Sequence, residues 1–325
     1  MATWEIPVVD LSPFLRPGDE DGKREVIEEI EKACCECGCF QILNHGVPLE
    51  VMRRALKVSK NFFESPVEEK LKCSPLQAAV PFPVGYNRKP NPLYEFAEYF
   101  VMLRPGSTYN VTLPNHQDFR EVTEELFNEF VKVGILLQTI LGKCLGLPPN
   151  TLEQINNSRD SDVMSVLYYL AATENEKIGL TAHKDVGCIT ILFQDEVGGL
   201  EVENNGVWTP VPPLKDALVV NLGIVLQILT NEKFKSPSHR VMRPNGRSRN
   251  SFSFFFNVSG ATVLEPLPEF TKEIGEKARY KRFVYKEFIQ KRNEHRAKRT
   301  LDQQQGGDDS GLSYFSLNSD LREMD

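Results

Sequence analysis

Two histidines and one aspartate form the most distinctive chemical pattern in the sequence. His183 and Asp185 stand two apart in a run of β-type composition, so a strand would direct both side chains to one face. His239 follows in a later segment that has no helical period. Two imidazoles and one carboxylate are the ligand set of a non-haem Fe(II) site with open positions. Zinc can take the same ligands, so the three residues alone leave the metal open.

A basic residue and several alternating side chains follow the second histidine. On a strand, Arg249, Ser251, Ser253, Phe255 and Asn257 would share one face. A guanidinium beside a hydroxyl is suited to a carboxylate, because arginine offers planar bidentate donors and keeps its charge at any cellular pH. A metal with open positions and a nearby carboxylate clamp together suggest that a small keto acid lies between them.

The order of these motifs resembles the plant-type 2-oxoglutarate- and Fe(II)-dependent dioxygenases, which have the isopenicillin N synthase-like fold. That family has H-x-D, a second histidine and then R-x-S, which match residues 183–185, His239 and residues 249–251 here. The resemblance extends through IPVVDLS, GCFQILNHGVP, GGLEVENNGVWTPVPP and ALVVNLG, so it covers nearly all of residues 5–295. It implies Fe(II), with 2-oxoglutarate and O2 as co-substrates and ascorbate in a supporting role.

The resemblance also implies roles for single residues. A tyrosine at the position of Tyr169 gives its hydroxyl to the distal carboxylate of 2-oxoglutarate, beside Arg249 and Ser251. For candidate contacts with the main substrate, packing in the core or exposure to solvent is the alternative. These candidates are Phe255, Lys184, Tyr86 and Phe100.

Four positions depart from the family pattern. Leu167 stands where many members have asparagine, and Ile224 where aspartate is usual. Val258 replaces a common proline, and Lys184 a frequent threonine. None of these changes removes an expected metal ligand, so we expect altered surroundings of the metal or of the pocket.

Short apolar runs divided by Gly, Asn and Pro begin at Val163 and predict a sandwich or jelly roll. Apolar residues at helical spacing predict helices over 23–37, 49–72 and 119–146, and the basic stretch 270–298 is expected to be a solvated helix that covers the barrel. The resemblance implies a mixed α/β (α+β) fold, with a double-stranded β-helix core and flanking helices. We expect an N-terminal region 1–110, a backing helix region 111–160, a catalytic region 161–298 and a disordered tail 299–325.

The remaining cysteines and histidines have simpler interpretations. Cys34, Cys35, Cys37 and Cys39 lack paired C-x-x-C spacing, and we expect packing thiols and no zinc site. We expect Cys188 to be a small residue that lines the barrel. His45 lies in an Asn-His-Gly turn and has no ligand neighbour, which predicts a structural role.

Composition limits the function classes. The net charge of −7 over 325 residues argues against nucleic-acid binding, and acidic and amide residues interrupt the basic stretch near the C-terminus. No apolar run is long enough for a membrane span and no signal pattern is present, so we expect a cytoplasmic protein. We expect a monomer whose partner is a small-molecule substrate.

The leading hypothesis is an oxygenase that hydroxylates, desaturates or demethylates a small organic molecule in plant specialised or hormone metabolism. It would convert 2-oxoglutarate to succinate and CO2. One alternative is an iron oxidase of the same scaffold that needs no keto acid. A second alternative is a catalytically silent member that binds a ligand.

Overall fold

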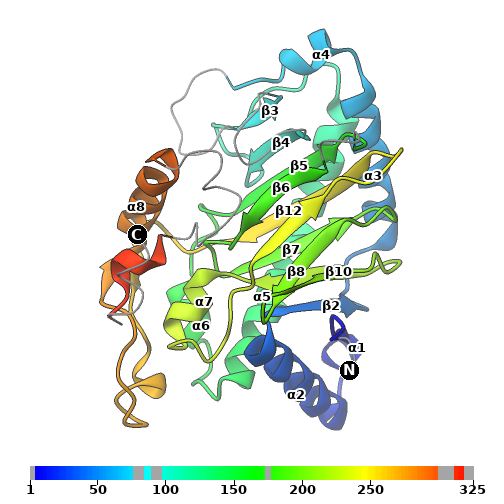
Figure 1. The fold of residues 1–325 in the computed structure, drawn as a ribbon. Coiled ribbons are helices and arrows are strands. Elements are labelled where there is room, and N and C mark those ends of the chain that lie inside the picture. Colours follow the sequence, from blue (N-terminus) through cyan, green and yellow to red (C-terminus); the bar gives the residue numbers. More distant parts are fainter. Residues whose placement is uncertain (1–3, 76–83, 89–96, 173–176, 299–310, 318–325) are drawn as a thin grey trace.

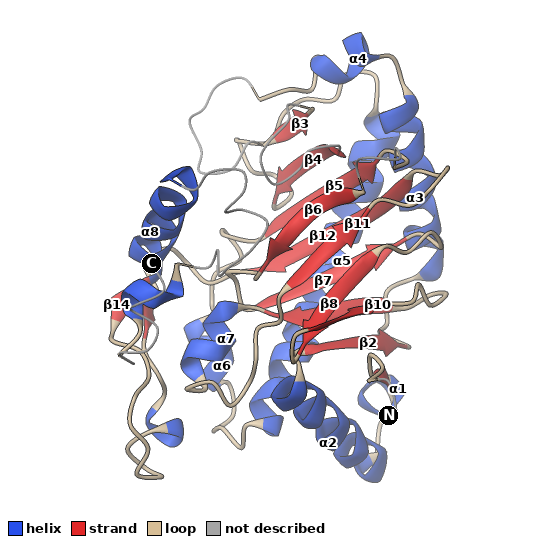
Figure 2. Ribbon diagram, viewed as in Figure 1, coloured by secondary structure: helices blue, strands red, loops and turns tan. Residues whose placement is uncertain are grey.

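The protein is built from two facing β-sheets, with helices against the outer face of the larger sheet (Figure 1, Figure 2). The computed structural model describes residues 4–75, 84–88, 97–172, 177–298 and 311–317. The two facing sheets and their helical cover agree with the predicted jelly-roll core and flanking helices.

The larger sheet has eight strands among the described residues. β1 pairs parallel with β2, and the other neighbours pair antiparallel. In spatial order the strands are β1 (Val8–Asp10), β2 (Cys39–Leu43), β10 (Leu218–Leu222), β7 (Ile189–Gln194), β12 (Arg249–Phe256), β5 (Val163–Tyr169), β4 (Ala97–Leu103) and β3 (Gly85–Asn87).

The smaller sheet has four strands and packs on the inner face of the larger one. Leu180, Val202 and Val241 from the smaller sheet share a buried cluster with residues of β4, β5 and β7. The strands in spatial order are β6 (Ile178–His183), β11 (His239–Met242), β8 (Leu200–Asn204) and β9 (Val207–Pro210).

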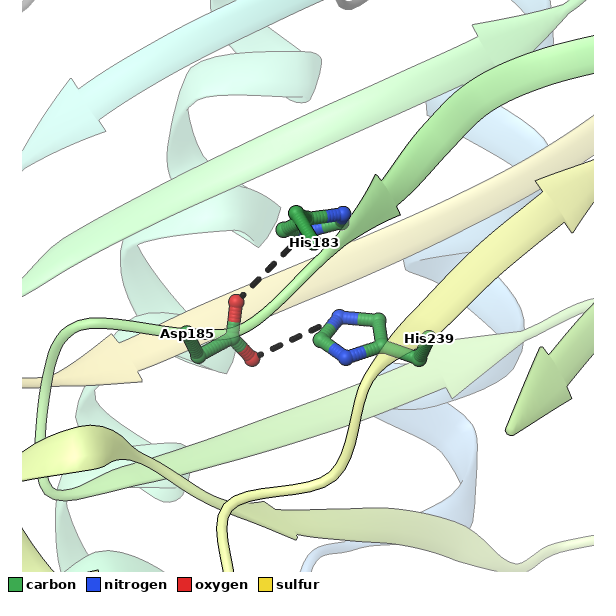
Figure 3. Close-up of side chains that lie close together, drawn as sticks. All are labelled: His183, Asp185 and His239. Atoms are coloured by element: carbon green, nitrogen blue, oxygen red, sulfur yellow. Dashed lines mark ion pairs between the residues drawn. The ribbon is translucent and has the colours of Figure 1, made fainter. Parts of the chain in front are cut away.

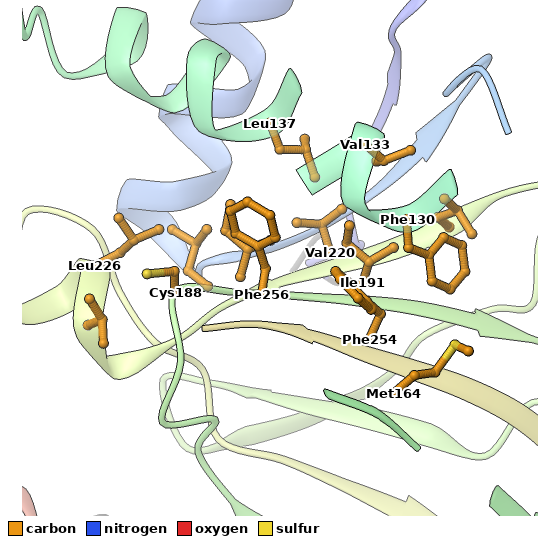
Figure 4. Close-up of a cluster of buried hydrophobic side chains, with 14 of the residues drawn as sticks. Phe130, Val133, Leu137, Met164, Cys188, Ile191, Val220, Leu226, Phe254 and Phe256 are labelled. Atoms are coloured by element: carbon orange, nitrogen blue, oxygen red, sulfur yellow. The ribbon is translucent and has the colours of Figure 1, made fainter. Parts of the chain in front are cut away.

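Alternation along β12 assigns its side chains to two different cores. Phe252, Phe254 and Phe256 belong to the core on the helix side, whereas Phe255 packs in the core between the sheets. Figure 4 shows Phe254 and Phe256 facing the long helix α5 (Gln117–Cys144). This division follows from the two-residue period of a strand and agrees with the face predicted for Phe255.

The helices that cover the larger sheet begin and end close to the predicted positions. α2 (Glu20–Glu36) and α3 (Leu49–Glu64) both contact α5. The predicted helix over 49–72 is interrupted at Ser65, because Pro66 favours an extended residue before it, and a short α4 (Val67–Leu71) follows. The remaining short helices are α1 (Ser12–Leu15), α6 (Thr151–Ile155) and α7 (Ile224–Leu229).

The helix predicted over 270–298 is wrong in its first half. Only α8 (Tyr285–Lys298) is helical there, and turns precede it, with Gly275 at φ +74°. Residues 272–279 are all exposed, including Ile274 at 63%, so packing buries no apolar side chain that could stabilise a helix there. Before α8 lie β13 (Val263–Leu264), the 3₁₀ turn η1 (Pro268–Phe270) and β14 (Phe283–Val284).

Part of the predicted disordered tail is ordered and docked. Residues 311–317 contain the 3₁₀ turn η2 (Leu312–Phe315), and the ring of Phe315 lies 4.1 Å from that of Phe283. The backbone N–H of Lys281 donates to the Phe315 carbonyl at 2.9 Å. Apolar side chains within the polar tail provide this local packing, while the other tail residues lie outside the described ranges.

The predicted N-terminal and catalytic regions form one sheet. Residues 1–110 supply β1, β2, β3 and β4, and residues 161–298 supply the other four strands. The region boundaries themselves stay a prediction. No helix in the described part of the chain has the length and apolar character to span a membrane.

Candidate metal and co-substrate site

Three side chains from two segments of the chain meet between the two sheets (Figure 3). His183 ends β6 and His239 begins β11, and the two residues are paired in the antiparallel ladder. Nε2 of His183 lies 3.7 Å from Oδ1 of Asp185, and Nε2 of His239 lies 3.6 Å from Oδ2. One ligand atom from each residue falls within 4.8 Å of the others, which is close enough for one metal ion to contact all three. Strand register therefore brings distant sequence positions into one ligand group.

Both imidazoles are oriented by backbone carbonyls. Nδ1 of His183 lies 2.9 Å from the Thr181 carbonyl oxygen, and Nδ1 of His239 lies 3.3 Å from that of Pro237. A carbonyl only accepts hydrogen bonds, so each Nδ1 carries the hydrogen and each Nε2 keeps its lone pair. Such contacts fix the tautomer that binds a metal.

The loop that carries Asp185 is fixed by the start of α7. The Ile224 N–H donates to the Asp185 carbonyl at 2.8 Å, and the Gly223 N–H donates to the Cys188 carbonyl at 2.8 Å. A Cβ on Gly223 would lie 2.0 Å from the Gly187 carbonyl oxygen, so this close approach requires glycine. The side chain of Ile224 is buried in the helix-side core and does not face the carboxylate.

A hydroxyl holds the carboxylate itself. Oγ1 of Thr190, on β7, donates to Oδ2 of Asp185 at 2.6 Å. Both side chains are 5% exposed. The hydrogen bond fixes the carboxylate plane and uses one lone pair of Oδ2, which leaves other lone pairs for a cation.

Arg249 is a fully buried cation whose side-chain partners are neutral. Nη1 donates to Oγ of Ser251 at 3.0 Å, Nη2 donates to Oε1 of Gln194 at 2.9 Å, and Nε has no partner among the described residues. The guanidinium carbon lies 5.2 Å from the centre of the Tyr169 ring. Burial lowers the pKa of Arg249, while Tyr169 and Asp195 oppose that shift. No carboxylate in the described ranges lies within ion-pairing distance, so the fold leaves the charge available to an anion.

The inward side chains of β12, β5 and β4 form registered rows. Arg249 is paired with Tyr169, and Ser251 with Leu167. Tyr169 lies in the core between the sheets, as the co-substrate role requires, and Leu167 places an apolar group opposite Ser251. Near the other end of β12, Phe255 is paired with Val163 on β5 and with Thr190 on β7.

Two expected substrate contacts lie on the wrong face of the sheet. Tyr86 and Phe100 are 1% and 3% exposed and both pack edge-on against Phe62 of α3 in the helix-side core. Tyr86 also donates its hydroxyl to Glu98 at 2.9 Å. The neighbour of Phe100 that faces inward on β4 is Tyr99, because a shift of one residue turns a strand side chain to the other face.

Lys184 is half-buried beside the ligands, and its ammonium has no polar partner within the described structure. Cys188 does not line the barrel as expected, because it faces the helix-side core near Leu226 (Figure 4), and burial raises the pKa of its thiol to about 12. His45 accepts from the Val47 N–H through Nδ1, and its other nitrogen meets the Asp216 carbonyl, which confirms the structural interpretation.

The four clustered cysteines are free thiols. Burial raises the pKa of Cys34, Cys35, Cys37 and Cys39. Among the described residues, the one group suited to a metal is the histidine and aspartate group at positions 183, 185 and 239. Cys34 packs in the helix-side core, and Cys37 and Cys39 pack in the core between the sheets.

The sequence interpretation missed two polar residues of the site, Gln194 and Thr190. Both lie on β7 at alternate positions that face inward. The signal was the spacing of Thr190, Leu192 and Gln194, which a strand turns to one face.

Two family models together match most of the chain. The model described as 2OG-Fe(II) oxygenase superfamily matches residues 161–258, and the model described as non-haem dioxygenase in morphine synthesis N-terminal matches residues 6–105. Gibberellin 2-beta-dioxygenase 7 of Arabidopsis thaliana is 32% identical over 316 residues, covering 96% of this chain and 89% of the relative. Jasmonate-induced oxygenase 1 of the same plant is 33% identical, covering 83% of this chain and 68% of the relative.

Solved structures agree with these matches. JOX2 in complex with 2OG, Fe and JA has a TM-score of 0.77 at 25% identity, covering 97% of this chain and 90% of that chain. The 2-oxoglutarate binary complex of the dioxygenase for auxin oxidation 1 from Arabidopsis thaliana has a TM-score of 0.70 at 27% identity, covering 84% and 100%.

Proposed function

Since the chain belongs to the 2OG-Fe(II) oxygenase superfamily, we propose that His183, Asp185 and His239 are its iron ligands. The protein is an Fe(II)- and 2-oxoglutarate-dependent oxidoreductase. The ligand group fits this metal, because two Nε2 lone pairs and one carboxylate converge and leave the remaining positions of an octahedral ion open.

Arg249, Ser251 and Tyr169 bind the distal carboxylate of 2-oxoglutarate in this proposal. The observation that carries it is the buried guanidinium of Arg249, which has only neutral partners and an unpaired Nε. A buried cation without a counter-charge is costly, and a dicarboxylate would relieve that cost. Ser251 and the Tyr169 ring fix the position of the guanidinium beforehand.

The residues around the metal group orient the reactants and exclude water. When bound, Fe(II) supplies the activation of O2 that is coupled to oxidative decarboxylation of 2-oxoglutarate to succinate and CO2. Thr190 and the α7 start hold Asp185, and the carbonyls of Thr181 and Pro237 hold the imidazoles. Preset ligands need little rearrangement at the moment of reaction.

The main substrate is a small organic molecule with an apolar part. Phe255 is paired with Thr190, whose hydroxyl holds Asp185, so an apolar row of Phe255, Val163 and Leu103 begins beside the metal group. Relatives named gibberellin dioxygenase, jasmonate-induced oxygenase and scopoletin hydroxylase point to hormones and specialised metabolites. Hydroxylation, desaturation or demethylation of such a compound is the proposed reaction.

The chain acts as a cytoplasmic monomer without a nucleic-acid partner in this proposal. The seven free cysteines fit a reducing compartment, and the net charge of −7 disfavours polyanions. Light scattering after size exclusion should give the mass of one chain, and a dimer mass would contradict the monomer.

The co-substrate site is tested by calorimetric titration with 2-oxoglutarate without oxygen, with Mn²⁺ in place of Fe(II). The wild type should bind 2-oxoglutarate in a metal-dependent way. Arg249→Met should retain Mn²⁺ binding and lose most of its affinity for 2-oxoglutarate, because the cation is removed. Asp185→Ala should lose Mn²⁺ binding, and with it the metal-dependent binding of 2-oxoglutarate. Unchanged 2-oxoglutarate binding by Arg249→Met would overturn the proposed clamp.

A further inference from the structure

A glutamine holds the other side of the buried guanidinium. Gln194 is the last residue of β7 and is paired with Ser251 on β12. Its Oε1 accepts from Nη2 of Arg249 at 2.9 Å, while Ser251 accepts from Nη1 at 3.0 Å. The two terminal nitrogens are therefore fixed by acceptors on two different strands, and the plane of the guanidinium is defined.

The amide nitrogen of this glutamine is left without a partner. Nε2 of Gln194 is a buried atom with no hydrogen bond to any described residue. An unpaired buried amide donor is costly, since it has lost its water without gaining an acceptor. Nε of Arg249, the side chain that Gln194 contacts through Oε1, is also unpaired. Two unpaired donors on two hydrogen-bonded side chains indicate that an acceptor binds here.

Gln194 is uncharged, whereas the next residue in the sequence, Asp195, carries a carboxylate. Asp195 is directed elsewhere, with its oxygens accepting from the backbone N–H groups of Asn250 at 2.6 Å and Val197 at 3.0 Å. An amide holds Arg249 without neutralising it, whereas a carboxylate at the same 2.9 Å would form an ion pair and occupy the charge.

We propose that Gln194 is a co-substrate-binding residue of this enzyme. Its Oε1 positions Arg249, and its Nε2 donates a hydrogen bond to the distal carboxylate of the keto acid. This inference rests on the proposed function, in which Arg249 binds that carboxylate. It adds a residue outside the H-x-D, histidine and R-x-S pattern, and it explains why an amide and not a carboxylate occupies this position.

The test compares Gln194→Met, which keeps the size, with Gln194→Glu, which adds a charge. Calorimetry without oxygen and with Mn²⁺ should show about a tenfold weaker 2-oxoglutarate affinity for Gln194→Met, as expected for the loss of a hydrogen bond to a charged group. Gln194→Glu should weaken it further, on the order of a hundredfold, because its carboxylate competes for Arg249. Mn²⁺ affinity should stay unchanged in both, which a general structural defect would not allow.

Gln41 provides a matched control. It is 1% exposed, its Nε2 is also unpaired, and it lies on β2, from which β10 and β7 separate β12. Gln41→Met should bind 2-oxoglutarate like the wild type.

The outcomes separate this inference from the proposed function. Suppose that folded Gln194→Met and Gln194→Glu bind 2-oxoglutarate as tightly as the wild type, while Arg249→Met loses affinity. That result would overturn the role of Gln194 alone. Wild-type affinity in Arg249→Met as well would overturn the clamp and the inference together. In turnover, the KM for 2-oxoglutarate should rise in Gln194→Met more than kcat falls, because the contact is made to the bound ground state as well.

Discussion

Removing the hydroxyl of Thr190 should weaken metal binding without unfolding the protein. Thr190→Val keeps the shape of the side chain and deletes the 2.6 Å hydrogen bond to Oδ2 of Asp185. Loss of a group that orients a metal ligand lowers metal affinity by roughly 10- to 100-fold, which is about 1.4 to 2.7 kcal/mol. The short distance and the carboxylate acceptor place this hydrogen bond among the stronger ones.

The assay is an anaerobic competition titration of Mn²⁺ or Fe(II) against a chromophoric chelator. Thr123→Val is the matched control, because Thr123 is fully buried in α5 and its hydroxyl donates only to helix carbonyls, those of Phe119 and Arg120. Thr123→Val should keep the wild-type metal affinity. The reasoning is refuted if Thr190→Val, folded as judged by urea unfolding, binds metal within a factor of two of the wild type.

Three further changes have defined expectations. Gly223→Ala should cost about 1 to 3 kcal/mol and weaken metal binding, since its Cβ would meet the Gly187 carbonyl at 2.0 Å; unaltered metal affinity would contradict this. Phe315→Ala should lower the free energy of unfolding by roughly 3 kcal/mol in urea titration with unchanged 2-oxoglutarate affinity. Burial raises the pKa of Asp162 to about 7 from 3.8. As pH rises, the unfolded chain therefore releases this proton before the folded chain does. The free energy of unfolding of the wild type should fall relative to that of Asp162→Asn as pH rises from roughly 4 to 7. Parallel pH profiles of urea unfolding for the two proteins would argue against this expectation.

The candidate metal ligands and the co-substrate residues could be predicted, because their residue types and their order in the sequence indicate the chemistry of the site. Two imidazoles and a carboxylate indicate a metal site, and strand alternation places Arg249, Ser251 and Phe255 on one face. The pairing of His183 with His239 could not be predicted in the same way, because long-range register depends on the whole sheet.

The errors arose where one-residue precision or tertiary packing decides. Tyr86 and Phe100 are aromatic like pocket residues, yet strand phase turns them to the helices. The composition of residues 299–325 predicts disorder, although a few apolar side chains around Phe315 dock on α8 and its neighbours. Gln194 escaped notice because a single glutamine carries no signal until a buried arginine lies opposite it.

The most direct test of the account is the formation of succinate from 2-oxoglutarate. Protein loaded anaerobically with Fe(II) is exposed to air with a panel of phenolic, terpenoid and alkaloid compounds, and Asp185→Ala serves as the control. The account predicts succinate that rises with one class of compound and disappears in Asp185→Ala. Product formation without succinate, by protein that holds iron, would contradict the account and favour an oxidase that needs no keto acid.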